Sequence, residues 1–111
     1  MGQFVKGDIV KVLFRFSDLS NAKPRPALVL SDLRGEDSIL CQITKKCPKL
    51  DQGIKLLEES FVEDPLSVIP SFIRPVRIFI SFIDKIDSKI TSVTKETLGK
   101  VYAVLNSIFV A

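Results

Sequence analysis

The chain has 111 residues, of which 46% are apolar and 26% are charged, and this is the size and composition of one globular domain rather than of a disordered chain. Sixteen Lys and Arg residues outnumber thirteen Asp and Glu residues, and the sequence contains no histidine. The absence of histidine excludes His-based catalytic triads, His-based ribonuclease chemistry and zinc sites that need histidine ligands.

Neither a membrane segment nor a metal site is expected from the sequence. No apolar run approaches the roughly 18 residues that a membrane-spanning helix needs, and the first residues lack the apolar region of a signal peptide. Cys41 and Cys47 have no partners for a zinc site, so Cys41 is interpreted as a reduced thiol of the core. We therefore expect a single cytoplasmic domain over residues 1–111, without a metal ion or other cofactor.

The N-terminal part of the chain predicts two strands. Residues 8–16 alternate between apolar and polar side chains, which is the period-two pattern of a β-strand. The polar residues 17–24 predict a connection. Arg25-Pro26 then begins a buried strand over residues 27–30, since proline is tolerated at the first residues of a strand.

A third strand and a basic loop follow. Residues 32–37 predict a hairpin loop, and residues 39–45 predict a strand that carries Gln42 and Thr44 on one face. Residues 46–49 predict a basic loop, because two of these four residues are lysines.

The middle of the chain is less regular. Residues 53–57 predict a short fourth strand, and residues 58–71 predict irregular structure with short turns. Residues 72–82 again have the composition of a strand, in which Pro75 indicates either a sheet edge or a bulge.

The C-terminal residues predict a helix with Thr94 as its N-cap and Glu96 in its first turn. One apolar stripe with helical spacing comprises Leu98, Val101, Tyr102, Leu105, Ile108 and Phe109. Four or five short strands followed by a helix predict a mainly β, α+β domain: a small antiparallel barrel with the helix packed on it.

Several local patterns also coincide in a fixed order. They are Gly7-Asp8-Ile9-Val10, Phe14-Arg15-Phe16-Ser17-Asp18, Arg25-Pro26-Ala27-Leu28-Val29-Leu30-Ser31 and Cys41-Gln42-Ile43-Thr44. This ordered set resembles the MazF/PemK family of toxins from type II toxin–antitoxin systems. The resemblance extends from about Gly7 to the terminal helix and is strongest over residues 7–45. It implies an SH3-like barrel with added helices that assembles as a homodimer.

The resemblance also implies an activity. Toxins of this family are metal-independent endoribonucleases that cut single-stranded RNA at short sequences, leave a 2′,3′-cyclic phosphate and a 5′-hydroxyl, and so inhibit growth. The catalytic arginine of the family corresponds here to Arg25, and its catalytic threonine or serine corresponds to Thr44. The implied partners are the RNA and an acidic antitoxin, through which the complex binds DNA.

The two residue types suit this chemistry. The guanidinium of Arg25 presents a rigid fork of donors that matches phosphate oxygens, and the hydroxyl of Thr44 can donate to a non-bridging oxygen. Further candidates for RNA binding are Lys23, Gln42, Lys45, Lys46, Lys49, Arg74 and Arg77. A solvated basic loop is an equal alternative for Lys45, Lys46 and Lys49, and Arg74 and Arg77 are equally interpreted as charges that protect a strand edge.

Two segments depart from the family pattern, and two other functions stay open. Residues 21–24 lack the usual Gly and Ser, and residues 75–82 are more apolar than usual. One alternative function is a non-catalytic binding module on the same barrel, similar to gyrase poisons. The other is a decayed family member that is kept for antitoxin binding.

Overall fold

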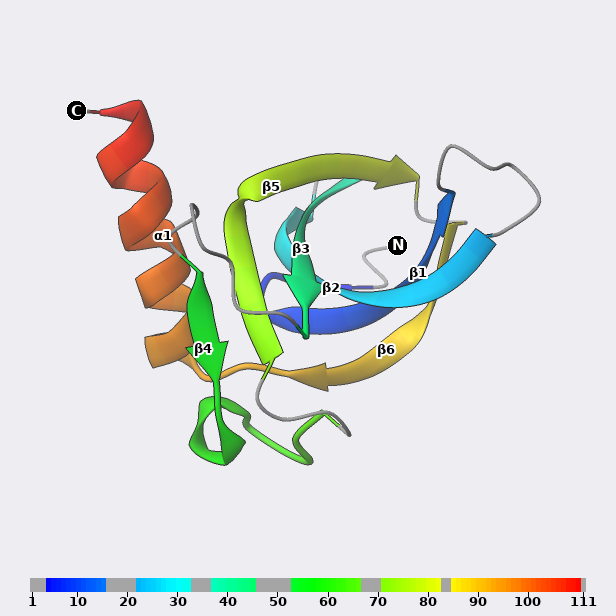
Figure 1. The fold of residues 1–111 in the computed structure, drawn as a ribbon, viewed down its shortest axis with the longest axis horizontal. Helices are drawn as coiled ribbons and strands as arrows, with labels where there is room; N and C mark the ends of the chain where they lie inside the picture. The colour runs from blue at the N-terminus through cyan, green and yellow to red at the C-terminus, as the bar shows by residue number, and fades with distance from the viewer. Residues whose placement is uncertain are drawn as a thin grey trace.

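The computed structural model describes residues 4–15, 22–32, 37–45, 53–66, 71–82 and 85–110. Six strands and one α-helix are formed within these ranges (Figure 1). In chain order the elements are β1 (Asp8–Arg15), β2 (Ala22–Asp32), β3 (Asp37–Thr44), β4 (Ile54–Leu56), the 3₁₀ helix η1 (Glu58–Ser60), β5 (Ser71–Phe82), β6 (Ile86–Ser92) and α1 (Lys95–Phe109). The strands form one sheet in the order β4-β5-β3-β2-β1-β6, and every pairing is antiparallel. The expected mainly β, α+β class is confirmed.

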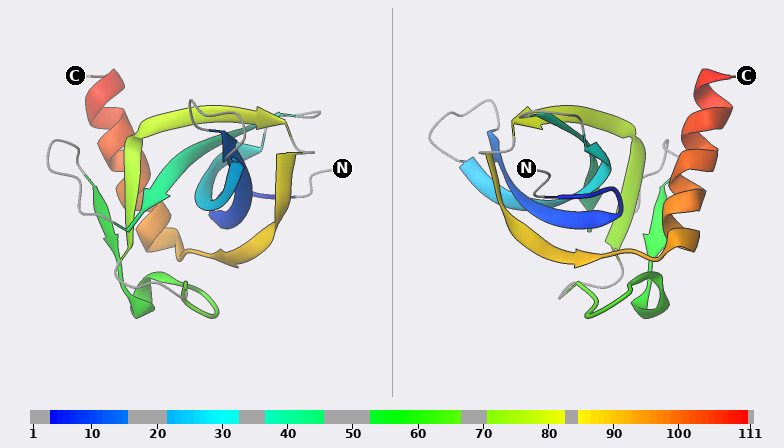
Figure 2. Two further views of the ribbon diagram at one scale, coloured as in Figure 1. Left: turned by 45° about the vertical axis from the view of Figure 1, so that its right-hand side comes forward. Right: turned by 180° about the vertical axis from the view of Figure 1, so that it is seen from behind.

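The sheet curls strongly, but it does not close into the expected barrel. β4 and β6 are its two outer strands, and α1 lies beside β4 and β5 on the outside of the curl (Figure 2). Among the described residues, the segments that follow β4 and β6 are joined by an isolated bridge between Phe61 and Val93 and by a few hydrogen bonds around it. These contacts do not make the continuous ladder that closure requires, so the structure is a curved open sheet.

Strand β2 begins earlier than the sequence predicts. It starts at Ala22 and includes Pro24 and Pro26, which lie opposite Leu13 and Lys11 of β1. The ladder from β2 to β3 begins only at Ala27. The prolines therefore occupy a stretch that pairs on one side, where a missing N–H does not interrupt a second ladder.

Pro75 lies at a bulge, on a stretch of β5 that pairs with β3 alone. β4 lies opposite only Ser71 to Ile73 of β5, so beyond Ile73 no described strand pairs with the other side of β5, and the predicted edge and bulge are both found here. Cys41 of β3 lies opposite Ile78, whereas its neighbour Gln42 lies opposite Arg74. Three residues of β5, Pro75 to Arg77, are thus left without a position on β3, and β5 bends sharply where they lie (Figure 1).

Strand β6 was not predicted, because its sequence carries few apolar residues and two bulges break the period-two pattern. Ile9 and Val10 of β1 lie opposite Thr91 and Lys89, so Ile90 is an extra residue. A second shift of the same kind lies between Lys11 and Val12, which pair with Ser88 and Ile86, so Asp87 is the second extra residue. A strand of this kind has no simple alternation for sequence analysis to detect.

The sheet carries a cluster of buried side chains on each face. One comprises Val10, Val12, Ala27, Val29, Leu40 and Ile86, with Phe4 and Phe79 packed against it. The other comprises Ile9, Leu28, Leu30, Cys41, Ile43, Leu56, Phe61, Leu66, Ile73, Val93 and Val101, with Ile39, Ile54, Leu98 and Leu105 packed against it. The alternation between the two clusters confirms the faces predicted for β1 and β3.

Helix α1 begins as predicted. The Thr94 hydroxyl accepts a hydrogen bond from the Thr97 N–H at 3.1 Å, as an N-cap does. Further along, the Tyr102 hydroxyl donates to the Leu30 carbonyl oxygen at 2.7 Å and ties the helix to β2. In the described part of the chain, no helix is long and apolar enough to cross a membrane.

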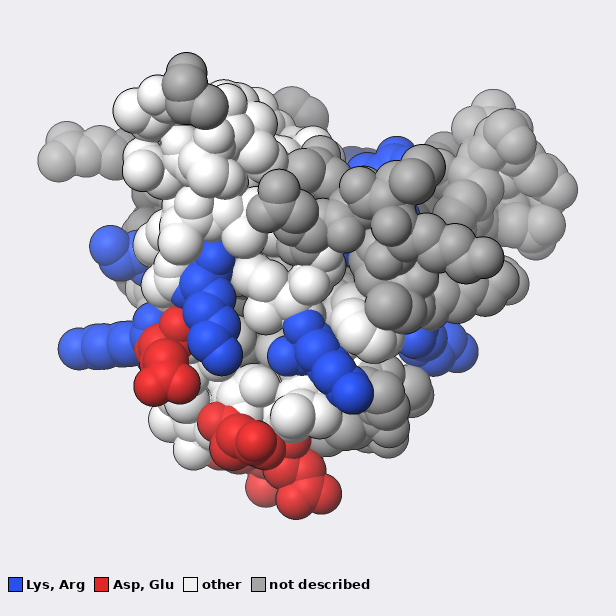
Figure 3. All heavy atoms as spheres, turned by 60° about the vertical axis from the view of Figure 1, so that its left-hand side comes forward, with Lys and Arg blue, Asp and Glu red and all other residues white. Residues whose placement is uncertain are grey.

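The predicted apolar stripe of α1 is buried only over its first half. Val101 is fully buried, but Phe109 is 73% exposed and Ile108 is also exposed, so the core role expected for them is wrong. No charged residue follows Lys100 in the sequence. Figure 3 shows the corresponding surface, an upper end of α1 without Lys, Arg, Asp or Glu side chains. Leu105 is the last residue of α1 among the described apolar residues that pack against the core cluster that includes Val101.

Candidate RNA-binding site

A cavity of about 710 Å³ lies where β2 begins and β3 ends. Its volume is within the usual range of ligand sites, roughly 300–1,000 Å³. The cavity is lined by Lys11, Pro24, Arg25, Pro26, Ile43, Thr44, Lys45, Pro65, Leu66, Ser71 and Ile90. These residues come from β1, β2, β3, β5, β6 and the segment after η1, so the site depends on the assembled sheet.

The two candidate catalytic residues line this same cavity. Ala27 of β2 lies opposite Gln42 of β3, where the ladder between the two strands begins, and Arg25 and Thr44 each lie two residues beyond this pair. Side chains two residues apart share a face of a strand, so both residues follow the face of this pair. The half-buried position of both residues leaves their polar ends within reach of a ligand in the cavity.

The cavity carries positive charge. Lys11, Arg25 and Lys45 are among its lining residues, and none of the described lining residues is acidic. Lys11 forms an ion pair with Asp87 on β6, with 3.7 Å between Nζ and Oδ2, and both side chains are largely exposed. Water screens an exposed pair of this kind, so it orients Lys11 more than it neutralises the cavity.

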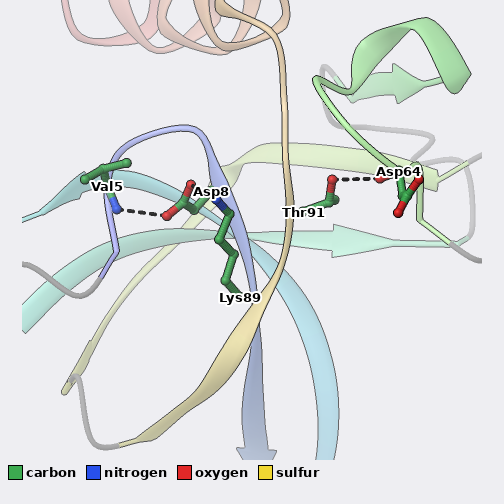
Figure 4. A network of polar contacts seen from close by, with 5 residues as sticks. All are labelled: Val5, Asp8, Asp64, Lys89 and Thr91. Atoms are coloured by element: carbon green, nitrogen blue, oxygen red, sulfur yellow. Dashed lines mark hydrogen bonds and ion pairs between the residues drawn. The ribbon is translucent and has the colours of Figure 1, made fainter.

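One wall of the cavity is apolar and firmly attached to β6. Pro65 and Leu66 form this wall with Ile90. The segment that carries them is joined to β6 by the Phe61–Val93 bridge and by the hydrogen bond from the Val62 N–H to the Ser92 carbonyl oxygen at 2.9 Å. The buried Thr91 hydroxyl donates to the Asp64 carbonyl oxygen at 2.7 Å (Figure 4).

The N-terminal end of β1 is also held to β6. The carboxylate of Asp8 is buried, accepts a hydrogen bond from the Val5 N–H at 3.0 Å and lies 3.6 Å from the Lys89 Nζ (Figure 4). Gly7 precedes it with a φ of 98°, a left-handed conformation that favours glycine. These contacts fix β6 on both sides of the bulge at Ile90.

The other predicted RNA-binding residues lie elsewhere or are not described. Arg74 donates to the Gln42 side-chain oxygen at 3.5 Å, and neither residue is among those that line the cavity. Arg77 is exposed on the β5 bulge. The backbone of Lys23 lies in β2 opposite Phe14, whereas Lys46 and Lys49 fall outside the described residues.

Sequence reasoning missed three kinds of cavity residue. Lys11 could have been found, because a hairpin of the first two strands places it beside the Arg25-Pro26 motif. Ser71 and Ile90 gave no signal, since their positions follow from long-range pairing and from the bulge. The segment with Pro65 and Leu66 was interpreted only as irregular structure.

No metal centre or reactive thiol is evident in the described ranges. They contain no group of three or more His, Cys, Asp or Glu side chains that could hold a metal ion. Cys41 is buried and free, and desolvation by burial raises the pKa of its thiol to about 12. A thiol with so high a pKa stays protonated and is a poor nucleophile at neutral pH.

No protein-family model matches the sequence, and the comparison with curated proteins likewise gives no match. Solved structures do match over nearly the whole chain. A mycobacterial endoribonuclease in complex with its cognate antitoxin is 15% identical with a TM-score of 0.70, and the match covers 94% of this chain and 92% of that one. The MazE-MazF structure from Deinococcus radiodurans is 16% identical with a TM-score of 0.74, over 96% and 95% of the two chains.

A third structure, the Mycobacterium tuberculosis toxin MazF-mt6, is 12% identical with a TM-score of 0.64, over 90% of this chain and 95% of that one. Identities of this size carry information about the fold and not about the activity. The curved six-stranded sheet with its terminal helix is therefore the fold of the MazF toxins.

Proposed function

We propose that this chain is the toxin of a toxin–antitoxin pair, an endoribonuclease that cleaves single-stranded RNA without a metal ion. The observation that carries the proposal is the position of Arg25 and Thr44 in one positively charged cavity. The fold of the molecule supports it, since the structures it resembles include endoribonuclease toxins.

In the proposed reaction the 2′-oxygen of the RNA attacks the neighbouring phosphorus and forms a new P–O bond. The bond from phosphorus to the 5′-oxygen breaks, and the net proton transfer runs from the 2′-hydroxyl to that leaving oxygen. The products are a 2′,3′-cyclic phosphate and a 5′-hydroxyl. Neither water nor a metal ion enters this balance.

Arg25 and Thr44 would act on the charge that develops during this step. The pentavalent transition state places additional negative charge on the non-bridging oxygens, which the guanidinium of Arg25 can bind with two parallel N–H groups. The Thr44 hydroxyl would donate to one of the same oxygens or orient the 2′-hydroxyl. A well-placed donor of this kind contributes about 10²–10³-fold to the rate.

Lys11 and Lys45 would hold the RNA backbone on either side of the reacting phosphate. They line the cavity together with Arg25, and neutralising phosphates is the main source of sequence-independent affinity for RNA. Lys23, Gln42, Lys46, Lys49, Arg74 and Arg77 stay proposed RNA contacts on the evidence of the sequence alone.

We further propose a homodimer and an acidic antitoxin as protein partners. The uncharged end of α1, with Tyr102, Ile108, Phe109 and Val110 exposed, supports a protein contact, because apolar surface in water favours association. The net charge of +3 suits an acidic antitoxin. One of the similar structures is itself a complex with an antitoxin.

The decisive experiment incubates the purified protein with a long, weakly structured RNA in EDTA and maps the new 5′-hydroxyl ends. We expect discrete cuts, a loss of at least about 100-fold in rate for Arg25→Ala, and no cut where the nucleotide 5′ to the cut is 2′-deoxy. Lys100→Ala is the matched control, because it removes an exposed positive charge on α1, outside the cavity.

RNA that stays intact with the wild-type protein would overturn the proposal. Binding of RNA without any cleavage would favour the decayed family member. Circular dichroism of Arg25→Ala checks that the fold is kept, and expression of the wild type with measurement of mRNA loss against DNA damage separates a ribonuclease from a gyrase poison.

A further inference from the structure

Ile90 of β6 is an exposed isoleucine that lines the cavity. It is 42% exposed and is the extra residue of the first β6 bulge. In a regular strand each residue pairs with one on the neighbour, whereas a bulge residue is free of the ladder and its side chain is re-aimed. Here the re-aimed side chain lines the cavity beside Pro65 and Leu66.

The three side chains form a continuous apolar wall without a polar group to satisfy. Leu66 is buried in the core beneath, while Pro65 and Ile90 are exposed. The hydrogen bond from Thr91 to the Asp64 carbonyl oxygen joins the two halves of the wall at the residue next to Ile90. The wall is therefore held in place before any ligand arrives, which lowers the entropic cost of binding.

Lys11 supplies a cation at the same cavity. The second β6 bulge provides Asp87, whose carboxylate lies 3.7 Å from the Lys11 Nζ. Both extra residues of β6 therefore contribute to this cavity: Ile90 is part of its apolar wall, and Asp87 forms the ion pair with Lys11. A nucleotide unit of RNA presents an apolar base face and an anionic phosphate, which an apolar wall and a cation can contact together.

We propose that the wall of Ile90, Pro65 and Leu66 is a nucleobase subsite next to the scissile phosphate, and that Lys11 binds the phosphate of the same nucleotide. The inference rests on the proposed endoribonuclease function and adds to it the residues that hold a base. A wall without hydrogen-bonding groups recognises the face of the base and leaves recognition of its edge to other residues.

The test compares Ile90→Ala with Ile80→Ala on three short RNAs that span a mapped cut. One RNA is complete; in each of the other two, one of the two nucleotides flanking the cut keeps its sugar and phosphate but lacks its base. Ile80 is the matched control, because it is a 65% exposed isoleucine on β5 that does not line the cavity.

We expect Ile90→Ala to lower kcat/KM on the complete RNA by about 5- to 20-fold, because the substitution removes part of the apolar contact with the base. On one of the two base-free RNAs, the same substitution changes kcat/KM less than about twofold, because the contact is already missing. Ile80→Ala is expected to behave as the wild type on all of them. Equal losses from Ile90→Ala on complete and base-free RNAs would overturn the subsite.

Lys11 is tested by the salt dependence of binding to an uncleavable RNA with a 2′-deoxynucleotide at the cut. We expect Lys11→Ala to reduce the slope of log affinity against log salt by about 0.7, and Lys100→Ala to leave it unchanged. A wild-type protein that cuts RNA while Ile90→Ala and Lys11→Ala behave normally refutes this subsite alone. A wild type that cuts no RNA refutes the proposed function and the subsite with it.

Discussion

The cavity and the end of helix α1 are two exposed regions built in opposite ways. The cavity combines the cationic side chains of Lys11, Arg25 and Lys45 with hydroxyl and apolar groups, whereas α1 carries no charged side chain beyond Lys100. Charge suits a polyanion whose affinity comes from phosphate neutralisation, and uncharged apolar surface suits a protein partner. Under the proposed function, the cavity would contact RNA and the end of α1 would contact a protein partner.

The largest effect is expected from a substitution that keeps the positive charge of Arg25 but removes its planar guanidinium group. Arg25→Lys retains one positive charge but loses the planar fork of donors, so we expect cleavage to fall by about 100-fold. Single-turnover kinetics on a short RNA measure the effect, with thermal unfolding as the check on the fold. A rate near that of the wild type would mean that charge alone is enough at this position.

The salt concentration should affect RNA binding at the cavity and protein association through α1 differently. Three cations in the cavity predict a slope of about −2 for log affinity against log salt, so RNA binding weakens roughly 20-fold between 50 and 200 mM salt. Apolar association through α1 is expected to stay the same or strengthen over this range. Fluorescence anisotropy with uncleavable RNA and sedimentation of the protein alone provide the two measurements. If self-association of the protein weakened with salt as steeply as RNA binding does, the proposed difference between a charged RNA surface and an apolar protein surface would be wrong.

A charge placed on the uncharged surface should weaken the proposed homodimer. Phe109→Asp puts a carboxylate on a side chain that is 73% exposed, and we expect the dissociation constant of the dimer to rise at least about tenfold. Phe109→Leu is the matched control, because it keeps the surface apolar. Analytical ultracentrifugation over a concentration series measures both, and an unchanged constant for Phe109→Asp would move the dimer contact to another face.

The smallest effect concerns the core that both surfaces share. Burial raises the pKa of the Cys41 thiol to about 12, above the value of 9.0 for a free thiol. The unfolded chain therefore loses this proton at a lower pH than the folded chain, and stability falls as the pH rises from about 9 towards 12. At pH 10 the loss is about 1.4 kcal/mol relative to pH 8.

Urea unfolding of the wild type and of Cys41→Ala at pH 8 and pH 10 isolates this contribution. The alanine variant lacks the thiol, so its stability should fall less over the same interval. Equal changes in the two proteins would mean that Cys41 is more accessible to water than its complete burial indicates.

The sequence predicted what depends on local pattern. The alternation in residues 8–15 and the Thr94 cap identify β1 and the start of α1, because both signals lie within a few residues of one another. The choice of Arg25 and Thr44 as candidate catalytic residues came from a resemblance to known toxins, and both residues line the same cavity.

Features that depend on distant contacts were beyond sequence reasoning. β6 is polar and twice bulged, so its place beside β1 follows only from the assembled sheet. Ile90 and Ser71 reach the cavity for the same reason. In the outer half of α1 the helix was predicted correctly but its burial was not. A helical pattern of apolar residues does not show whether another element packs against each of them.

The bulges of β6 also bear on how the length of this strand can vary. Seven residues of β6 lie opposite five of β1, from Asp8 to Val12. Deleting one residue from a regular strand exchanges its two faces, and the domain would lose its core. Deleting Ile90 or Asp87 instead converts two residues opposite one into an ordinary pair and leaves every other pair in register. β6 can therefore shorten by one or two residues during evolution without a change of fold, and each such deletion would reshape the cavity.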